Sequence, residues 1–152
     1  MSEITIKLVS VNDVQTADNI DLLLDEYAQE SALDGMPSPV PDWRVYRIAE
    51  EAGCLFSFGA YADDKLVGFI GVQMTYAAQY SAHIGSTMAF FVDSNYRKFG
   101  TGKYLVDHAS DELSKRGAAA IAIGAPSESR LAKAAQSLGF KETNRLYMRT
   151  LP

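Results

Sequence analysis

The stretch that decides the fold runs from residue 90 to residue 105 and reads Phe90-Phe91-Val92-Asp93-Ser94-Asn95-Tyr96-Arg97-Lys98-Phe99-Gly100-Thr101-Gly102-Lys103-Tyr104-Leu105. Its apolar start predicts the end of a strand, and its last residues predict the first turn of an amphipathic helix. The first N–H groups of a helix lack partners and lie at its positive dipole end, so the turn is a candidate phosphate or pyrophosphate site. The glycines would let the backbone approach the anion closely.

The spacing Arg97-x-x-Gly100-x-Gly102 alone fits a plain turn as well as an anion site. Two familiar phosphate motifs are excluded. A P-loop requires glycine where Arg97 stands and serine or threonine where Tyr104 stands. A dinucleotide-binding fingerprint requires a third glycine where Leu105 stands. The choice therefore depends on the elements around the turn.

The first part of the chain predicts one strand, two helices and a hairpin. The strand covers residues 4–8, which alternate between apolar and polar. The first helix begins at Asp18 or Asn19 and stops at Gly35; after a proline loop, Asp42 caps the second. The apolar stripe predicted for this second helix consists of Val45, Ile48, Ala49 and Ala52. Strands at 55–61 and 66–75 then flank the turn residues Asp63-Asp64.

The second part predicts strand-helix alternation. A strand over 84–92 precedes a helix over 102–116, whose inward side chains are Leu105, Val106, Ala109 and Leu113. A two-sided apolar strand at 119–123 is expected inside the sheet. A helix capped by Ser127 and a final strand over 140–151 follow. The resulting order, β-α-α-β-β-β-α-β-α-β, predicts an α/β (α+β) fold class with a mixed sheet.

Composition narrows the class of protein. The chain has 152 residues, 47% of them hydrophobic, which predicts a single domain over residues 1–152. A net charge of −5 argues against nucleic-acid or anionic-membrane partners. Cys54 is the only cysteine, which excludes an internal disulfide and a multi-cysteine metal site. We predict no metal and, because no basic and apolar leader or long apolar run occurs, a cytoplasmic protein.

The ordered set of motifs resembles the GNAT superfamily of acyl-coenzyme A-dependent N-acyltransferases. The segment 92–105 is similar to the central motif of that family. Further landmarks are Leu66-Val67-Gly68-Phe69, Gly117-Ala118 and Ser137-Leu138-Gly139-Phe140, together with the two helices after the first strand. The resemblance covers nearly the whole chain and looks closest to a phage and bacterial branch of unassigned substrate. It implies a mostly antiparallel central sheet flanked by helices.

The resemblance also implies how acetyl-coenzyme A (acetyl-CoA) is held. The pyrophosphate is expected on the backbone N–H groups of the turn, namely Lys98, Phe99, Gly100, Thr101, Gly102 and Lys103, with Arg97 at the motif's arginine or glutamine position. Phe91 and Val92 take positions whose backbone pairs with the pantetheine arm. Lys98, Lys103, Arg130 and Lys133 are candidates for the nucleotide phosphates, although each is also interpretable as a solvated charge.

The resemblance fails at the general acid. In the family a tyrosine in the helix before the Leu-Gly-Phe element often protonates the leaving thiolate, and Ala135 stands there in this chain. Tyr147 and His83 are the candidate catalytic substitutes, although the sequence alone favours a packed tyrosine and a surface or capping histidine. For the acceptor, the resemblance suggests Glu30 and Asp34, and aromatic residues such as Trp43, Tyr76 and Tyr80 are further candidates.

The predicted function is an N-acetyltransferase that moves an acetyl group from acetyl-CoA to a primary amine of a small molecule or protein, by direct attack in a ternary complex. Two other classes stay open. The absence of the usual tyrosine suits a coenzyme A-binding regulatory protein with little or no turnover. The edge of the final predicted strand suits a dimerisation module, and a homodimer is a possible partner arrangement.

Overall fold

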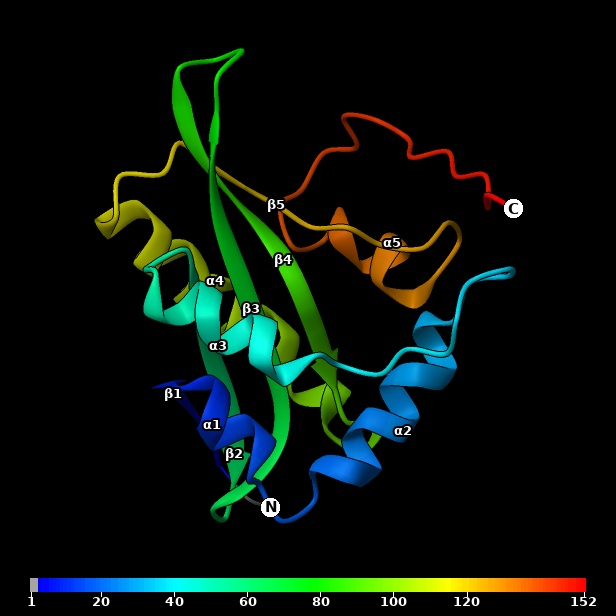
Figure 1. Ribbon diagram of the computed structural model, residues 1–152. Coiled ribbons are helices and arrows are strands. Elements are labelled where there is room, and N and C mark those ends of the chain that lie inside the picture. The colour runs from blue at the N-terminus through cyan, green and yellow to red at the C-terminus, as the bar shows by residue number, and fades with distance from the viewer. Residues whose placement is uncertain (1–2) are drawn as a thin grey trace.

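The computed structural model describes residues 3–152, so Met1 and Ser2 of the predicted domain lie outside it (Figure 1). Its strands form one five-stranded sheet in the order β1-β2-β3-β4-β5. All neighbouring pairs are antiparallel except β4 and β5, which are parallel. The strands are β1 (Ile4–Val9), β2 (Leu55–Ala62), β3 (Lys65–Ala77), β4 (Ala82–Val92) and β5 (Ala120–Ala122). The predicted mixed fold class is confirmed.

The helical elements are α1 (Val11–Gln15), α2 (Ile20–Ser31), α3 (Trp43–Glu51), the 3-10 helix η1 (Ser94–Phe99), α4 (Thr101–Lys115) and α5 (Arg130–Ala135). In Figure 1, α4 lies behind the sheet while α1, α2 and α3 lie in front of it. The short helix α1 was not predicted, although Ser10 and Asp13 form the capping box that signals its start. None of the described helices combines the length and apolar content needed to cross a membrane.

Each face of the sheet has its own apolar core. Behind the sheet, the predicted stripe of α4 is confirmed, because Leu105, Val106, Ala109 and Leu113 are all buried. In front of it, Ile20 and Leu23 of α2 are buried with Phe69 and Phe91 of the sheet. The hairpin between β2 and β3 is also confirmed, and both Asp63 and Asp64 adopt the positive φ of its tight turn. Helices therefore cover both faces of the central strands.

One edge of β4 is open over half of its length. The pairing between β4 and β5 covers only Ile84–Ser86, and no other strand within residues 3–152 pairs with the outer edge of residues 87–92. On the other edge, Gly71 of β3 pairs with Ala89 and Val72 pairs with Thr87. Met88 is therefore the extra residue of a β-bulge, a feature often found beside active sites.

The end of the chain differs from the prediction. Residues 140–152 form no strand, so the predicted strand over 140–151 is wrong. The side-chain hydrogen bonds of this segment join residues close in sequence, such as Arg145 and Glu142, and do not connect the segment to a neighbouring strand. β5 is consequently the last strand of the sheet, with Ala120 and Ala122 exposed, and not the buried inner strand that was predicted.

Two helices also differ from the prediction: α3 in its orientation and α5 in the residue at which it begins. The predicted apolar stripe of α3 faces outward, and Val45 and Ile48 are exposed, because Trp43 and Tyr46 face the sheet instead. Arg47 donates to Gln15, and Glu50 accepts from the N–H of Val11, which holds this orientation. The predicted Ser127 cap is wrong as well. Glu128 has a positive φ that a helix cannot contain, so α5 begins later and Ser129 caps it.

Candidate functional site

The turn between β4 and α4 presents backbone donors. Gly100 adopts a left-handed φ of 73°, ends η1 and is the N-cap residue of α4. No side chain caps α4, so its first-turn N–H groups at Thr101, Gly102 and Lys103 have no side-chain acceptor. A Cβ on Gly102 would meet only Phe90, at an ordinary contact distance of 3.7 Å. The turn therefore has the backbone donors that a site for an anion requires, as the sequence predicted.

The side chains of this turn are less available than its backbone. Thr101 is fully buried, and its hydroxyl donates to the carbonyl of Tyr96 at 2.9 Å. The Lys103 ammonium donates to Asp107 at 2.6 Å, and this hydrogen bond raises the pKa of Lys103. Lys98 and Phe99 are exposed. An anion would thus meet mainly peptide N–H groups and the helix dipole.

Arg97 and two carboxylates join the turn to α2. The Arg97 side chain is only 17% exposed. Its Nε donates to the carbonyl of Val92 at 2.8 Å, and its terminal nitrogen donates to Glu30 at 2.7 Å. Glu26 accepts from the N–H of Ser94 at 3.0 Å. Arg97 and Glu30 are therefore partners of each other, which gives both a structural role in this arrangement.

The open edge of β4 presents alternate residues. The N–H of Asp93 donates to the carbonyl of Val67 on β3 at 2.8 Å. Because strand residues alternate, the N–H of Phe91 also points to β3, whereas Phe90 and Val92 point their backbone groups to the open edge. Of the two residues predicted for pantetheine pairing, Val92 thus faces the edge, and Phe90 is its neighbour there.

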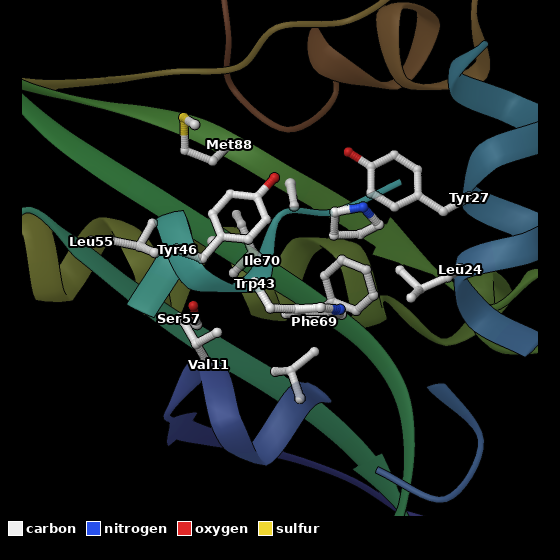
Figure 2. A pocket seen from close by; sticks show the side chains of 14 residues that line it. Val11, Leu24, Tyr27, Trp43, Tyr46, Leu55, Ser57, Phe69, Ile70 and Met88 are labelled. Carbon is white, nitrogen blue, oxygen red and sulfur yellow. The ribbon is translucent and has the colours of Figure 1, made fainter. Parts of the chain in front are cut away.

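A pocket lies against β4 on the front face of the sheet (Figure 2). Its volume, including the open mouth, is about 540 Å³. Its lining consists of apolar and aromatic side chains with one serine: Val11, Val14, Leu24, Tyr27, Pro41, Trp43, Tyr46, Leu55, Ser57, Phe69, Ile70, Gly71, Met88 and Ala89. The bulged Met88 is 43% exposed, and Ala89 follows it on β4. The pocket therefore meets β4 where its open edge begins.

Tyr27 connects this pocket with the open edge. It lines the pocket, and its hydroxyl lies near Ser31 and the backbone of Phe90. Its ring stacks on that of Phe91, with centroids 5.6 Å apart. Burial, and secondarily the nearby Tyr46, raises the pKa of Tyr27, so the hydroxyl stays protonated at neutral pH. Its helical spacing in the sequence predicted only a core residue. The signal that could have indicated a functional role is its position on the helix face towards β4.

The structure does not bring the other predicted catalytic and acceptor residues to this pocket. Tyr147 is 85% exposed in the C-terminal segment. His83 is exposed near the distal turn between β3 and β4, where its ring meets that of Tyr76 at 5.1 Å. Asp34 and Tyr80 are exposed and absent from the lining, and of the predicted aromatic residues only Trp43 contributes to it.

Comparison with known proteins places this arrangement among acetyltransferases. The solved structures that share the fold include a ribosomal-protein-alanine N-acetyltransferase from Brucella melitensis biovar Abortus 2308, with a TM-score of 0.73 and 21% identity over 99% of this chain and 100% of that one. A glucosamine-6-phosphate N-acetyltransferase from Arabidopsis thaliana has a TM-score of 0.73 and 15% identity over 99% of each chain. An aminoglycoside acetyltransferase from an uncultured soil metagenomic sample has a TM-score of 0.75 and 17% identity, again over 99% of each.

These identities establish the fold and leave the substrate open. A search of curated protein sequences found no match. The family comparison is more decisive, because residues 18–140 match the Acetyltransferase (GNAT) family. This region contains the open edge of β4, the uncapped start of α4 and most of the pocket. The chain belongs to the Acetyltransferase (GNAT) family.

Proposed function

We propose that this protein is an N-acetyltransferase that transfers an acetyl group from acetyl-CoA to a primary amine. The observation that carries the proposal is the continuity of three features. The open edge of β4 is joined through η1 to the uncapped N-terminus of α4, and the pocket lies beside that edge. A donor and an acceptor can therefore meet at one strand.

The described residues fit the donor. The N–H groups of Thr101, Gly102 and Lys103 would hold its pyrophosphate, because they have no side-chain cap and lie at a positive helix end. The N–H of Val92, whose carbonyl already accepts from Arg97, and the backbone of Phe90 would pair with the pantetheine amides as a short added strand. Acetyl-CoA supplies the activated acetyl group as a thioester. Lys98, Arg130 and Lys133 remain candidates for its nucleotide phosphates.

The proposed reaction is direct attack by a neutral amine in a ternary complex. The nitrogen forms a bond to the acetyl carbon while the carbon–sulfur bond breaks. The amine loses a proton to solvent, and the leaving thiolate gains one. Tyr27 is positioned to donate that proton, since its protonated hydroxyl lies at both the pocket and the β4 edge. Tyr147 and His83 stay as sequence-based alternatives for acid or base.

Three measurements test this function. Isothermal titration calorimetry with acetyl-CoA should show saturable binding at micromolar concentrations, and thiol release should depend on both acetyl-CoA and an added amine. Absence of binding at high micromolar acetyl-CoA would contradict the proposed donor. The second product should be the N-acetylated amine, identified by mass spectrometry in amounts equal to the thiol.

A second candidate is a coenzyme A-binding regulatory protein of the same fold. Ala135 favours it. This residue ends α5 and has no side chain that could donate a proton, where the family resemblance implies a tyrosine as the general acid. Saturable acetyl-CoA binding without thiol release from a broad panel of amines would support this candidate. Light scattering with and without acetyl-CoA tests the possible homodimer, for which the exposed Leu146 and Leu151 of the C-terminal segment are contact candidates.

A further inference from the structure

We infer that the acceptor is a small primary amine carried on an aromatic ring, and that the ring occupies the pocket in front of β3 and β4. The inference rests on the proposed acetyl transfer. It adds a substrate class, which the family and the compared structures leave open. Three features of the pocket support it: the charge of the lining, its shape, and its position relative to the open edge of β4.

The lining has no charge. None of the 14 lining residues is aspartate, glutamate, lysine, arginine or histidine. The carboxylates around the pocket have other partners, because Glu30 pairs with Arg97, Glu26 accepts from the N–H of Ser94, and Glu50 accepts from the N–H of Val11. A polycationic acceptor would lose hydration here without gaining an ion pair, which is costly. An acceptor with a single amine can keep that amine at the mouth.

The lining also has flat walls. Tyr27, Trp43, Tyr46 and Phe69 place aromatic rings around the space, and Figure 2 shows these rings gathered on one side of Met88. Gly71 leaves room at the sheet, since the nearest atom to an added Cβ would be the Ser57 hydroxyl oxygen at 3.6 Å. Aromatic rings favour stacked or edge-to-face neighbours. A ring fits this space better than a branched sugar with many hydroxyl groups.

The position of the pocket orients such a ligand. Met88 and Ala89 line the pocket, and the next residue, Phe90, contacts the hydroxyl of Tyr27 at the open edge. A ring held among the aromatic walls therefore directs a short aminoalkyl chain towards this edge. That is where the thioester would lie if pantetheine pairs with Phe90 and Val92. Phenylethylamine has this form.

Trp43 provides a direct readout, because it is the only tryptophan of the chain and lines the pocket. Phenylethylamine and its alcohol analogue phenylethanol, each titrated without acetyl-CoA, should change Trp43 fluorescence saturably and at similar concentrations. Kanamycin, a polycation, should not. With acetyl-CoA present, kcat/KM for phenylethylamine should exceed that for kanamycin by at least about tenfold, the contribution of a buried ring. Phenylethanol should inhibit competitively.

A pocket-filling variant tests the location. Gly71→Val adds two methyl groups and a Cβ at a site with room and ordinary backbone geometry, and should weaken phenylethylamine binding about tenfold. Ala78→Val adds similar volume at an exposed turn position and should leave binding unchanged. Circular dichroism checks that both variants fold. If Gly71→Val does not fold, the wild-type titrations decide the question alone.

The outcomes separate the two proposals. Fluorescence changes with phenylethylamine and phenylethanol, lost in Gly71→Val, support the aromatic site whether or not acetyl transfer occurs. Acetylation of kanamycin or of a peptide N-terminus at a higher kcat/KM than phenylethylamine would overturn the inference and leave the acetyltransferase intact. Failure of both aromatic probes to affect Trp43 would also overturn it. Failure of acetyl-CoA to bind would instead refute the proposed function.

Discussion

Replacing Gly102 by aspartate should stabilise the fold and weaken acetyl-CoA binding. Gly102 lies in the first turn of α4, which contains no acidic residue. A carboxylate near a helix N-terminus contributes about 0.3–1 kcal/mol of stability. Aspartate also has a helix propensity a few tenths of a kcal/mol better than glycine. Because a Cβ at this position meets Phe90 at an ordinary 3.7 Å, no steric cost offsets these gains.

The same carboxylate would occupy the proposed pyrophosphate site. Two like unit charges about 6 Å apart repel by about 0.7 kcal/mol in water and about 2.8 kcal/mol at an effective dielectric constant of 20. One such pair therefore weakens binding between about threefold and a hundredfold, and the pyrophosphate carries more than one charge. We expect the Kd for acetyl-CoA to rise by at least about tenfold, and by less at high salt.

Ser114→Asp is a control with the same change in net charge. Ser114 is exposed and lies near the C-terminal end of α4. Twelve residues of α-helix separate the two positions by about 18 Å. That distance exceeds the Debye length of about 8 Å at physiological salt, so coenzyme binding should not change. A carboxylate at position 114 lies near the negative end of the helix dipole, so the unfolding free energy should fall slightly.

Calorimetry of acetyl-CoA binding and urea unfolding are the two assays. In Gly102→Asp the unfolding free energy should rise while the affinity for acetyl-CoA falls. In Ser114→Asp the affinity for acetyl-CoA should not change. A folded Gly102→Asp protein that binds acetyl-CoA as tightly as wild type would show that the pyrophosphate does not lie on the start of α4. Equal weakening in both variants would indicate a nonspecific charge effect.

Four further variants test other contacts. Tyr27→Phe should lower kcat for acetyl transfer by about a hundredfold or more if Tyr27 is the proton donor, with unchanged acetyl-CoA affinity. Because the pKa of the buried phenol is raised, the folded state favours the protonated form, and the unfolding free energy of wild type in urea should fall above about pH 10. The unfolding free energy of Tyr27→Phe should fall less over the same pH range. Arg97→Ala should lower the unfolding free energy by about 1.5–3 kcal/mol, since Arg97 holds Val92 and Glu30, whereas the half-exposed Glu30→Gln should cost less than about 1 kcal/mol. Gly100→Ala should cost about 1–2 kcal/mol in the same assay because of its φ of 73°.

Local signals predicted much of the fold, including the glycine turn that precedes α4. The spacing of Leu105, Val106, Ala109 and Leu113 requires only that one face of a helix be buried, and that face is the one observed. The turn at Asp63-Asp64 likewise depends on residues adjacent in sequence. Such features are set by the backbone period and by turn chemistry, so one sequence suffices to identify them.

Features set by distant partners were not predictable in this way. The side of α3 that carries Val45 and Ile48 faces outward, whereas the aromatic rings of Trp43 and Tyr46 line the pocket on the sheet. The pocket itself combines residues from α1, α2, α3 and three strands. No periodicity in one segment specifies such a set. Tyr27 illustrates the consequence, since a residue of a core stripe and a residue that lines a pocket have the same helical spacing.

The site depends on where β5 ends. After Ala122 the chain no longer pairs with β4, and the N–H of Gly124 donates to the side chain of Thr87 instead of a backbone carbonyl. Pro126 follows and has no N–H to contribute to a ladder. If β5 continued in register, its backbone would satisfy the outer edge of β4 and leave no donors at Phe90 and Val92. The short, alanine-rich β5 therefore creates the open edge to which the turn, Tyr27 and the pocket all connect.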